Sequence, residues 1–409
     1  MKTIGIIEPY SSGLGLVTAA IELGYKVVIL KNLSNHLPLP ESIKEKCEVI
    51  DLPTNQENIF LDQVQKYQKK LKMQTILPGG ELSVLLANQA NRDLGLPGLH
   101  QNCWPTVKLK NEMRKVLDEA GLKNICYFVA QHFTEIPAII EKVGFPCVIK
   151  PVNYAGSVAV SLASNPKELA KSLKTALSLE DYLCGYSLKR AAIIEQYIEG
   201  PEFSIEGFVE NGEAQIVSVT EKILGPHPYF VERGHIVEAH LNQRVRDKIF
   251  QYVKKIITVM KINLGPFHME IRLDQEEPIL IEIAARLAGD HIIDLIHISK
   301  KIDLRKIMIQ NYLNMPISVL QYSPPKIKKT AGIIYFIRDG LRSYNSVHGI
   351  DALKKLEGLE EYHLDIAPHE PIPEAVDYRG RIGYSIFSAS SYEKLKNNLM
   401  QADRCLIFK

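Results

Sequence analysis

The stretch from Phe267 to Asp290 constrains the fold of this chain more than any other segment; it reads FHMEIRLDQEEPILIEIAARLAGD. Residues 269–273 alternate apolar with polar side chains, which is typical of a half-buried strand. Residues 275–278 are polar and favour a turn, and residues 279–281 are apolar again. The pattern therefore predicts a β-hairpin in which Glu270 and Glu282 lie beside each other.

Two neighbouring carboxylates repel each other unless a cation lies between them. Oxygen ligands suit Mg²⁺, which proteins bind through one or two carboxylates together with substrate phosphates. Arg286 follows Glu282 by four residues, so its guanidinium would face the same phosphates. An ordinary acidic surface hairpin is the alternative. We predict a magnesium site formed by Glu270 and Glu282.

Composition excludes several classes of protein. The 409 residues are enough for two or three domains, and the net charge of +2 indicates no nucleic-acid or membrane partner. The six cysteines include no C-x-x-C pair, which argues against a disulfide framework and for a reducing compartment. No signal-peptide pattern and no 18-residue apolar run occur. We therefore expect a cytoplasmic protein.

The first thirty residues predict a βαβ unit with a glycine-containing turn. Its spacing is not G-x-G-x-x-G, so we expect these glycines to serve the turn itself. Glu81 follows a later strand, where open α/β sheets bind ligands, although capping of the next helix is the alternative. Residues 103–106 read as a linker, and residues 225–235 read as a loop.

A second candidate phosphate site follows the predicted strand 147–151. This strand carries Lys150 near its end and leads into the small-residue loop 152–157. Such an arrangement can bring an ammonium group and backbone N–H groups around phosphates. The loop motif is too short to be specific by itself.

Taken in order, these motifs resemble the ATP-grasp superfamily of carboxylate–amine ligases. The Ala-Ala-Arg-Leu-Ala-Gly run at 284–289 is similar to the L-amino acid ligase branch, which joins free amino acids into dipeptides. The resemblance implies an α/β fold with α+β lobes and four parts. These are an N-terminal βαβ, Rossmann-like domain (1–104), a small lobe with the lid (105–198), a large lobe with the metal and substrate site (199–322) and a C-terminal subdomain (323–409).

The resemblance also implies roles for individual residues. It places Mg²⁺, with Mn²⁺ as the alternative ion, on Glu270 and Glu282, and it makes Arg286 and Lys150 catalytic. The glutamate of the hinge, Glu202, would hold the ribose of ATP. The remaining ATP-binding residues would be Lys110, Lys150, Gly156, Ser157, Glu195, Gln196, Tyr197 and Ile198.

The amino-acid substrate would be bound by a Glu-x-x-His pair, Glu232 and His235, together with further residues of the pocket. These are Glu81, Arg286 and Gly289. Two positions depart from the usual pattern. Ala284 stands where many members have a metal-binding Asn, and Glu238 stands where the branch often has Pro.

The expected function is ATP-dependent formation of an amide bond between L-amino acids through an acyl-phosphate. Two alternatives remain: a ligase of the same mechanism with another amine or a carrier-bound acceptor, and a non-catalytic nucleotide-binding protein, suggested by Ala284. The resemblance implies small-molecule amino-acid substrates and a homodimer.

Overall fold

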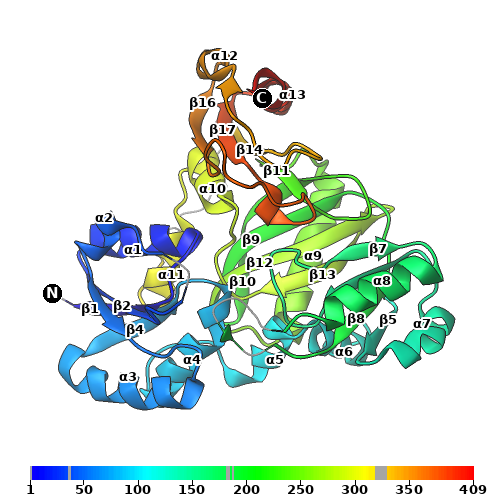
Figure 1. Ribbon diagram of the computed structural model, residues 1–409. Coiled ribbons are helices and arrows are strands. Elements are labelled where there is room, and N and C mark those ends of the chain that lie inside the picture. The colour runs from blue at the N-terminus through cyan, green and yellow to red at the C-terminus, as the bar shows by residue number, and fades with distance from the viewer. Residues whose placement is uncertain (1, 36–37, 181–184, 187, 318–328) are drawn as a thin grey trace.

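The computed structural model describes residues 2–35, 38–180, 185–186, 188–317 and 329–409. The predicted domain boundary at 322/323 therefore lies outside the described residues. Three larger sheets organise the chain (Figure 1). No helix among the described residues is both long and apolar enough to cross a membrane.

The N-terminal part is a parallel sheet in the order β3-β2-β1-β4, as the predicted βαβ unit requires. Its strands are β1 (Thr3–Ile7), β2 (Lys26–Lys31), β3 (Glu48–Asp51) and β4 (Met73–Pro78). The connecting helices are α1 (Ser12–Glu22), α2 (Glu41–Lys44), α3 (Glu57–Leu71), η1 (Glu81–Ser83) and α4 (Val84–Asp93).

Close backbone contact explains one glycine of the first turn. A Cβ atom on Gly13 would lie 1.9 Å from the backbone oxygen of Gly79, so only glycine fits. The start of α1 thereby packs against the loop after β4, which leads into Glu81. This glycine serves close packing, whereas the sequence predicted that it serves the turn itself.

The connection to the next sheet is helical. It consists of η2 (Gln101–Cys103), α5 (Trp104–Lys108) and α6 (Lys110–Glu119). The segment 103–106, predicted as a linker, does connect the two sheets, but it is helical. Pro105 occupies the first turn of α5, where its missing N–H is no loss, so the sequence Trp-Pro opens a helix here.

The second sheet is antiparallel, in the order β5-β8-β6-β7. Its strands are β5 (Tyr127–Ala130), β6 (Cys147–Pro151), β7 (Ser161–Ala163) and β8 (Ala192–Gln196). The helical segments η3 (Phe133–Glu135), α7 (Ile136–Lys142) and α8 (Pro166–Leu177) belong to this lobe, and they share an apolar core with the sheet.

The largest sheet has eight strands in the order β13-β12-β9-β10-β11-β14-β17-β16. They are β9 (Glu202–Glu210), β10 (Glu213–Leu224), β11 (Glu232–Val237), β12 (Gly265–Asp274), β13 (Glu277–Ala284), β14 (Thr330–Phe336), β16 (Leu359–Leu364) and β17 (Gly383–Ala389). Strands from the C-terminal segment thus continue the sheet that carries the central hairpin.

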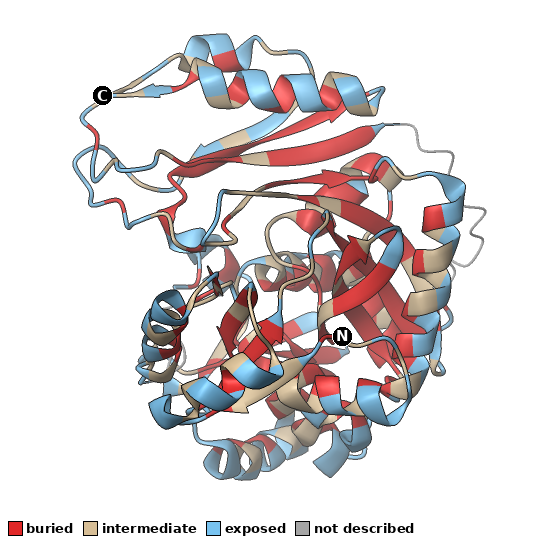
Figure 2. Cartoon of the chain, turned by 90° about the vertical axis from the view of Figure 1, so that its right-hand side faces the viewer, coloured by how far each residue is buried: buried red, intermediate tan, exposed pale blue. Residues whose placement is uncertain are grey.

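Helices cover this sheet, and its strands are largely buried (Figure 2). The helices of this part of the chain are α9 (Gln243–Val259), α10 (Ile292–Lys300), α11 (Leu304–Tyr312), α12 (Ile350–Lys354), η6 (Tyr378–Gly380) and α13 (Tyr392–Cys405). A separate two-stranded sheet consists of β15 (Val347–His348) and β18 (Ile407–Phe408). One apolar core joins Leu16 of α1 to Ile307 of α11 and Ile333 of β14. The N-terminal sheet is therefore packed firmly against the large lobe.

Candidate active site

One cavity of about 440 Å³ lies where the three sheets meet, and its wall contains every residue that the sequence predicted for the site. They are Glu81, Lys110, Lys150, Gly156, Ser157, Glu195, Gln196, Tyr197, Ile198, Glu202, Glu232, His235, Glu270, Glu282, Arg286 and Gly289. The structure thus brings the set together, while the role of each residue stays a prediction.

The central hairpin forms as predicted, from β12 and β13. Glu270 and Glu282 are direct cross-strand partners, and the register shifts immediately after this pair. Such an irregularity changes the direction in which the following side chains point. Both carboxylates line the cavity, and Glu282 is about one third exposed, so it is open to a ligand.

Each cation predicted for phosphate is paired with a carboxylate. Lys150 Nζ lies 2.7 Å from Glu195 Oε2, and Arg286 Nε donates to Glu81 Oε2 at 2.7 Å. Lys110 Nζ lies 3.0 Å from Glu282 Oε1 and donates to the backbone oxygen of Tyr154. Because every one of these charges is already compensated, a bound phosphate would exchange partners with the carboxylates.

The hinge around the end of β8 makes several hydrogen bonds and ion pairs. Glu195 is buried, and burial opposes its ionisation, yet Arg114 and Lys150 lower the pKa of its carboxyl group to about 2. The backbone N–H of Tyr197 donates to the oxygen of Pro146 at 3.0 Å. Arg272 donates to the backbone oxygen of Ile198 at 3.0 Å and lies over the ring of Tyr197. These contacts hold a flat, partly aromatic wall in place.

Lys222 of β10 lines the cavity and was not among the residues predicted from the sequence. Its buried ammonium lies 2.8 Å from Glu202, 2.7 Å from Glu232 and 2.7 Å from Glu270. One cation therefore connects the groups predicted for ribose, substrate and metal. Burial opposes its charge, but the three carboxylates raise the pKa of Lys222 well above its usual value. The only signal in the sequence was a lysine within an otherwise mostly apolar strand.

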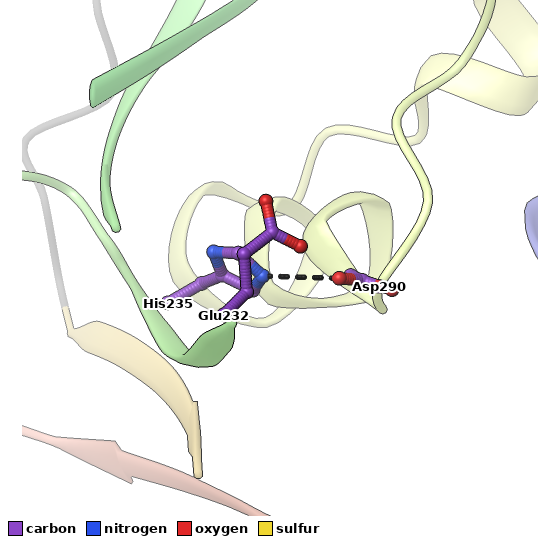
Figure 3. A group of neighbouring side chains, drawn as sticks. All are labelled: Glu232, His235 and Asp290. Carbon is purple, nitrogen blue, oxygen red and sulfur yellow. Dashed lines mark hydrogen bonds and ion pairs between the residues drawn. The ribbon is translucent and has the colours of Figure 1, made fainter. Parts of the chain in front are cut away.

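The Glu-x-x-His segment lies on a strand rather than in the predicted loop, because β11 pairs with both β10 and β14. Residues three apart on a regular strand face opposite sides. Here the register shifts so that Leu224 opposes Glu232, and both Glu232 and His235 line the cavity. Asp290, from the loop before α10, completes the group, with His235 Nε2 3.4 Å from Asp290 Oδ2 (Figure 3).

Glu238 does not line the cavity. Its buried carboxylate is paired with Arg246 of α9 and with Lys300 of α10, at 2.5 Å from the latter. Glu238, which stands in place of the usual Pro, therefore connects the end of β11 to α9 and α10 through two ion pairs. It gives no reason to expect an altered substrate pocket.

The lid loop contains Gly156 in the left-handed region, with φ of 72°. A Cβ atom added there would lie 3.1 Å from the ring of Tyr378, which also lines the cavity. The C-terminal segment, residues 329–409, therefore places the ring of Tyr378 beside the loop that is predicted to cover the phosphates.

The residues present fit a magnesium ion. Glu270 and Glu282 are adjacent oxygen donors, and two lysines, Lys222 and Lys110, contact them where a cation would otherwise be required. Ala284 lines the cavity next to this pair and brings no ligand atom of its own in its methyl side chain. Any further ligands would have to come from phosphates or water.

A family model described as an ATP-grasp domain matches residues 143–294, which span the lysine strand, the hinge and the hairpin. The chain is also similar to alanine–anticapsin ligase of Bacillus subtilis, at 26% identity over 315 residues. That match covers 71% of this chain and 65% of the relative, slightly less than two thirds of its length. Dapdiamide A synthase of Enterobacter agglomerans is 25% identical over 298 residues, covering 70% of this chain and 68% of that protein.

Among solved structures, the L-amino acid ligase from Bacillus licheniformis superposes with a TM-score of 0.84. The match covers 100% of this chain and 99% of that one, at 23% identity. At this identity the likeness concerns the fold, and it confirms the fold class predicted from the sequence.

Proposed function

Since residues 143–294 form an ATP-grasp domain within an ATP-grasp fold, we propose that the chain is an ATP-dependent carboxylate–amine ligase that joins two L-amino acids. The observation that carries the proposal is that one cavity is lined by the hinge residues, by the cations predicted to contact phosphate, by the paired carboxylates and by the Glu232–His235 group. The names of the two curated relatives, both ligases or synthases, support the same class.

The reaction would proceed in two steps. A carboxylate oxygen of the first amino acid attacks the γ-phosphorus of ATP, the bond from that phosphorus to the β,γ-bridging oxygen breaks, and an acyl-phosphate and ADP result. The amine of the second amino acid then attacks the acyl carbon and phosphate leaves. Phosphoryl transfer needs mainly positioning and charge neutralisation from a protein. The cavity offers cations and carboxylates for this purpose.

Individual residues would act as follows. Glu270 and Glu282 would hold Mg²⁺, which when bound neutralises charge on the β- and γ-phosphates. Lys110, Lys150 and Arg286 would leave their carboxylate partners to contact phosphate oxygens. Closure of the Gly156 loop would exclude water from the acyl-phosphate.

A substrate screen tests the proposal. Purified protein with ATP and Mg²⁺ is incubated with pairs of L-amino acids, and ADP release and product mass are measured together. Equal amounts of ADP and dipeptide are expected for at least one pair. A Glu282→Gln variant, which removes a carboxylate proposed to hold Mg²⁺, should lose this activity. A Glu48→Gln variant makes the same change at a surface ion pair and serves as its matched control. Nucleotide binding without turnover on any pair would contradict the proposal and favour a non-catalytic role.

A further inference from the structure

Arg381 reaches the substrate end of the cavity from the C-terminal segment. Its Nη1 donates to Asp290 Oδ1 at 2.9 Å and its Nη2 to Asp290 Oδ2 at 2.8 Å. The same Nη2 lies 3.2 Å from Glu232 Oε2 and 3.2 Å from the Glu232 backbone oxygen. One guanidinium therefore bridges β11 and the loop before α10.

This bridge is held tightly. Arg381 is 9% exposed, and its guanidinium carbon lies 3.7 Å above the centre of the Tyr335 ring. A bidentate contact to a carboxylate fixes geometry as well as charge. Glu232 and Asp290 line the cavity, whereas Arg381 lies behind them. Arg381 would thus act on a ligand through these two carboxylates.

We propose that Arg381 is a positioning residue that holds Glu232 and Asp290 together as the acceptor for an amino group. That amino group belongs to the amino acid whose carboxylate is activated, so the inference rests on the proposed ligase function. Without the guanidinium, these two adjacent and only partly exposed carboxylates would repel each other. With it, each oxygen keeps a lone pair for a donor in the cavity.

The position of Asp290 indicates which substrate is bound. Asp290 follows Arg286 by four residues in one loop, and both line the same cavity. Glu81, the other acid predicted to meet this amine, already pairs with Arg286 at 2.7 Å and Lys108 at 3.3 Å. Glu232 and Asp290 offer this amine two further carboxylates, both held in place by Arg381.

A metal ion is a weaker occupant of this group. One ligand atom each from Glu232, His235 and Asp290 lies within 4.8 Å of the others, as a metal site requires (Figure 3). However, Arg381 contacts both oxygens of Asp290, and Lys222 with Arg381 contacts both oxygens of Glu232. A divalent ion would have to displace these cations, whereas an ammonium group needs only hydrogen bonds.

The test compares four variants: Arg381→Met, Arg381→Lys, Asp290→Asn and, as the matched control, Arg338→Met. Arg338 also belongs to the C-terminal segment and pairs with Asp403 at 2.6 Å, outside the cavity. The probes are L-alanine against propionate and L-phenylalanine against 3-phenylpropionate, so each pair differs by the amino group alone; L-alaninamide, an amine without a free carboxylate, is the common acceptor in every assay. ADP release gives kcat and KM for each acid and for ATP, and thermal unfolding reports the fold.

We expect Arg381→Met and Asp290→Asn to lower kcat/KM for the amino acid by about tenfold to a hundredfold, the loss expected for a charged hydrogen bond. The KM for ATP should change less than about twofold, since the nucleotide contacts are elsewhere. The preference of wild type for the amino acid over its des-amino partner should collapse in both variants. Arg381→Lys should recover part of the loss, and Arg338→Met should keep wild-type kinetics.

Other results would overturn the inference. An unchanged amino-acid preference in Asp290→Asn and Arg381→Lys, both of which keep a polar group in place, contradicts it even if Arg381→Met unfolds. A parallel rise of KM for ATP and amino acid would indicate a merely structural role. Absence of wild-type turnover on every acid would remove the proposed function, and this inference with it.

Discussion

Replacing Glu195 by Gln should lower the free energy of unfolding by about 3 kcal/mol at pH 7. The carboxylate is 3% exposed and accepts Arg114 Nε at 2.7 Å and Lys150 Nζ at 2.7 Å. Its pKa falls from 4.5 to about 2 because the two cations outweigh burial. At about 1.4 kcal/mol per pKa unit, this difference gives the stated magnitude. The loss of one partner from a buried ion pair, about 3–5 kcal/mol, agrees.

The pH dependence gives a second, independent readout. Because the folded pKa lies below the unfolded one, the contribution is complete above pH 4.5 and is lost as the pH falls toward 2. The difference between wild type and Glu195→Gln should therefore shrink by about 0.8 kcal/mol between pH 7 and pH 4. Urea unfolding at both pH values measures it.

Glu48→Gln is the control for this experiment. Glu48 pairs with Lys26 at 2.6 Å, but both side chains are well exposed, so the change should cost less than about 1 kcal/mol. If Glu195→Gln unfolded within about 0.5 kcal/mol of wild type at pH 7, or if the difference grew at pH 4, the assignment of stability to this buried pair would be refuted.

Three further outcomes are expected. Glu282→Ala should abolish ADP release while the thermal midpoint stays near that of wild type, and chelation of Mg²⁺ should do the same reversibly; retained turnover in either experiment would remove the metal assignment. Gly156→Ala should slow turnover, because alanine is strained at φ 72° and its methyl group would crowd Tyr378; steady-state kinetics at saturating ATP would detect it, and unchanged kcat would show that the lid tolerates the change. Burial opposes protonation of His268, yet Glu206 and Glu270 raise its pKa to about 9, above the usual 6.5. The cationic form of His268 therefore contributes its full stability below pH 6.5, and this contribution is lost as the pH rises through about 9. The thermal midpoints of wild type and His268→Gln are compared at pH 7 and pH 10. A difference between the two proteins that stays the same at both pH values would contradict this expectation.

The central hairpin was predictable because its information is local. Alternating side chains over 269–273 and a polar turn set the strand register, and this register makes Glu270 and Glu282 partners. The same holds for Lys150, which ends a buried strand. The remaining predicted site residues came from the order of several short motifs, none of which was specific alone.

Lys222, Asp290 and Arg381 could not be recognised in this way. Lys222 and Arg381 are single charged residues without a local motif, and Asp290, although it follows the 284–289 run, gains its role only through contacts with His235 and Arg381 from distant parts of the chain. The strand character of 232–235 was also missed. One of its pairing partners, residues 220–224, is close in sequence, but the other, residues 331–334, lies far along the chain. The helix at 104–108 was missed because Trp-Pro was taken as a break rather than a helix start.

The contact between Lys110 and Glu282 has a consequence for how ligands enter. A metal ion held by Glu282 would free the lysine for a phosphate oxygen, and a phosphate held by the lysine would free the glutamate for the ion. Each ligand would thus make binding of the other easier, and such cooperation is reciprocal by thermodynamic necessity. Nucleotide affinity should depend steeply on magnesium concentration, and the two should load as a unit rather than in sequence.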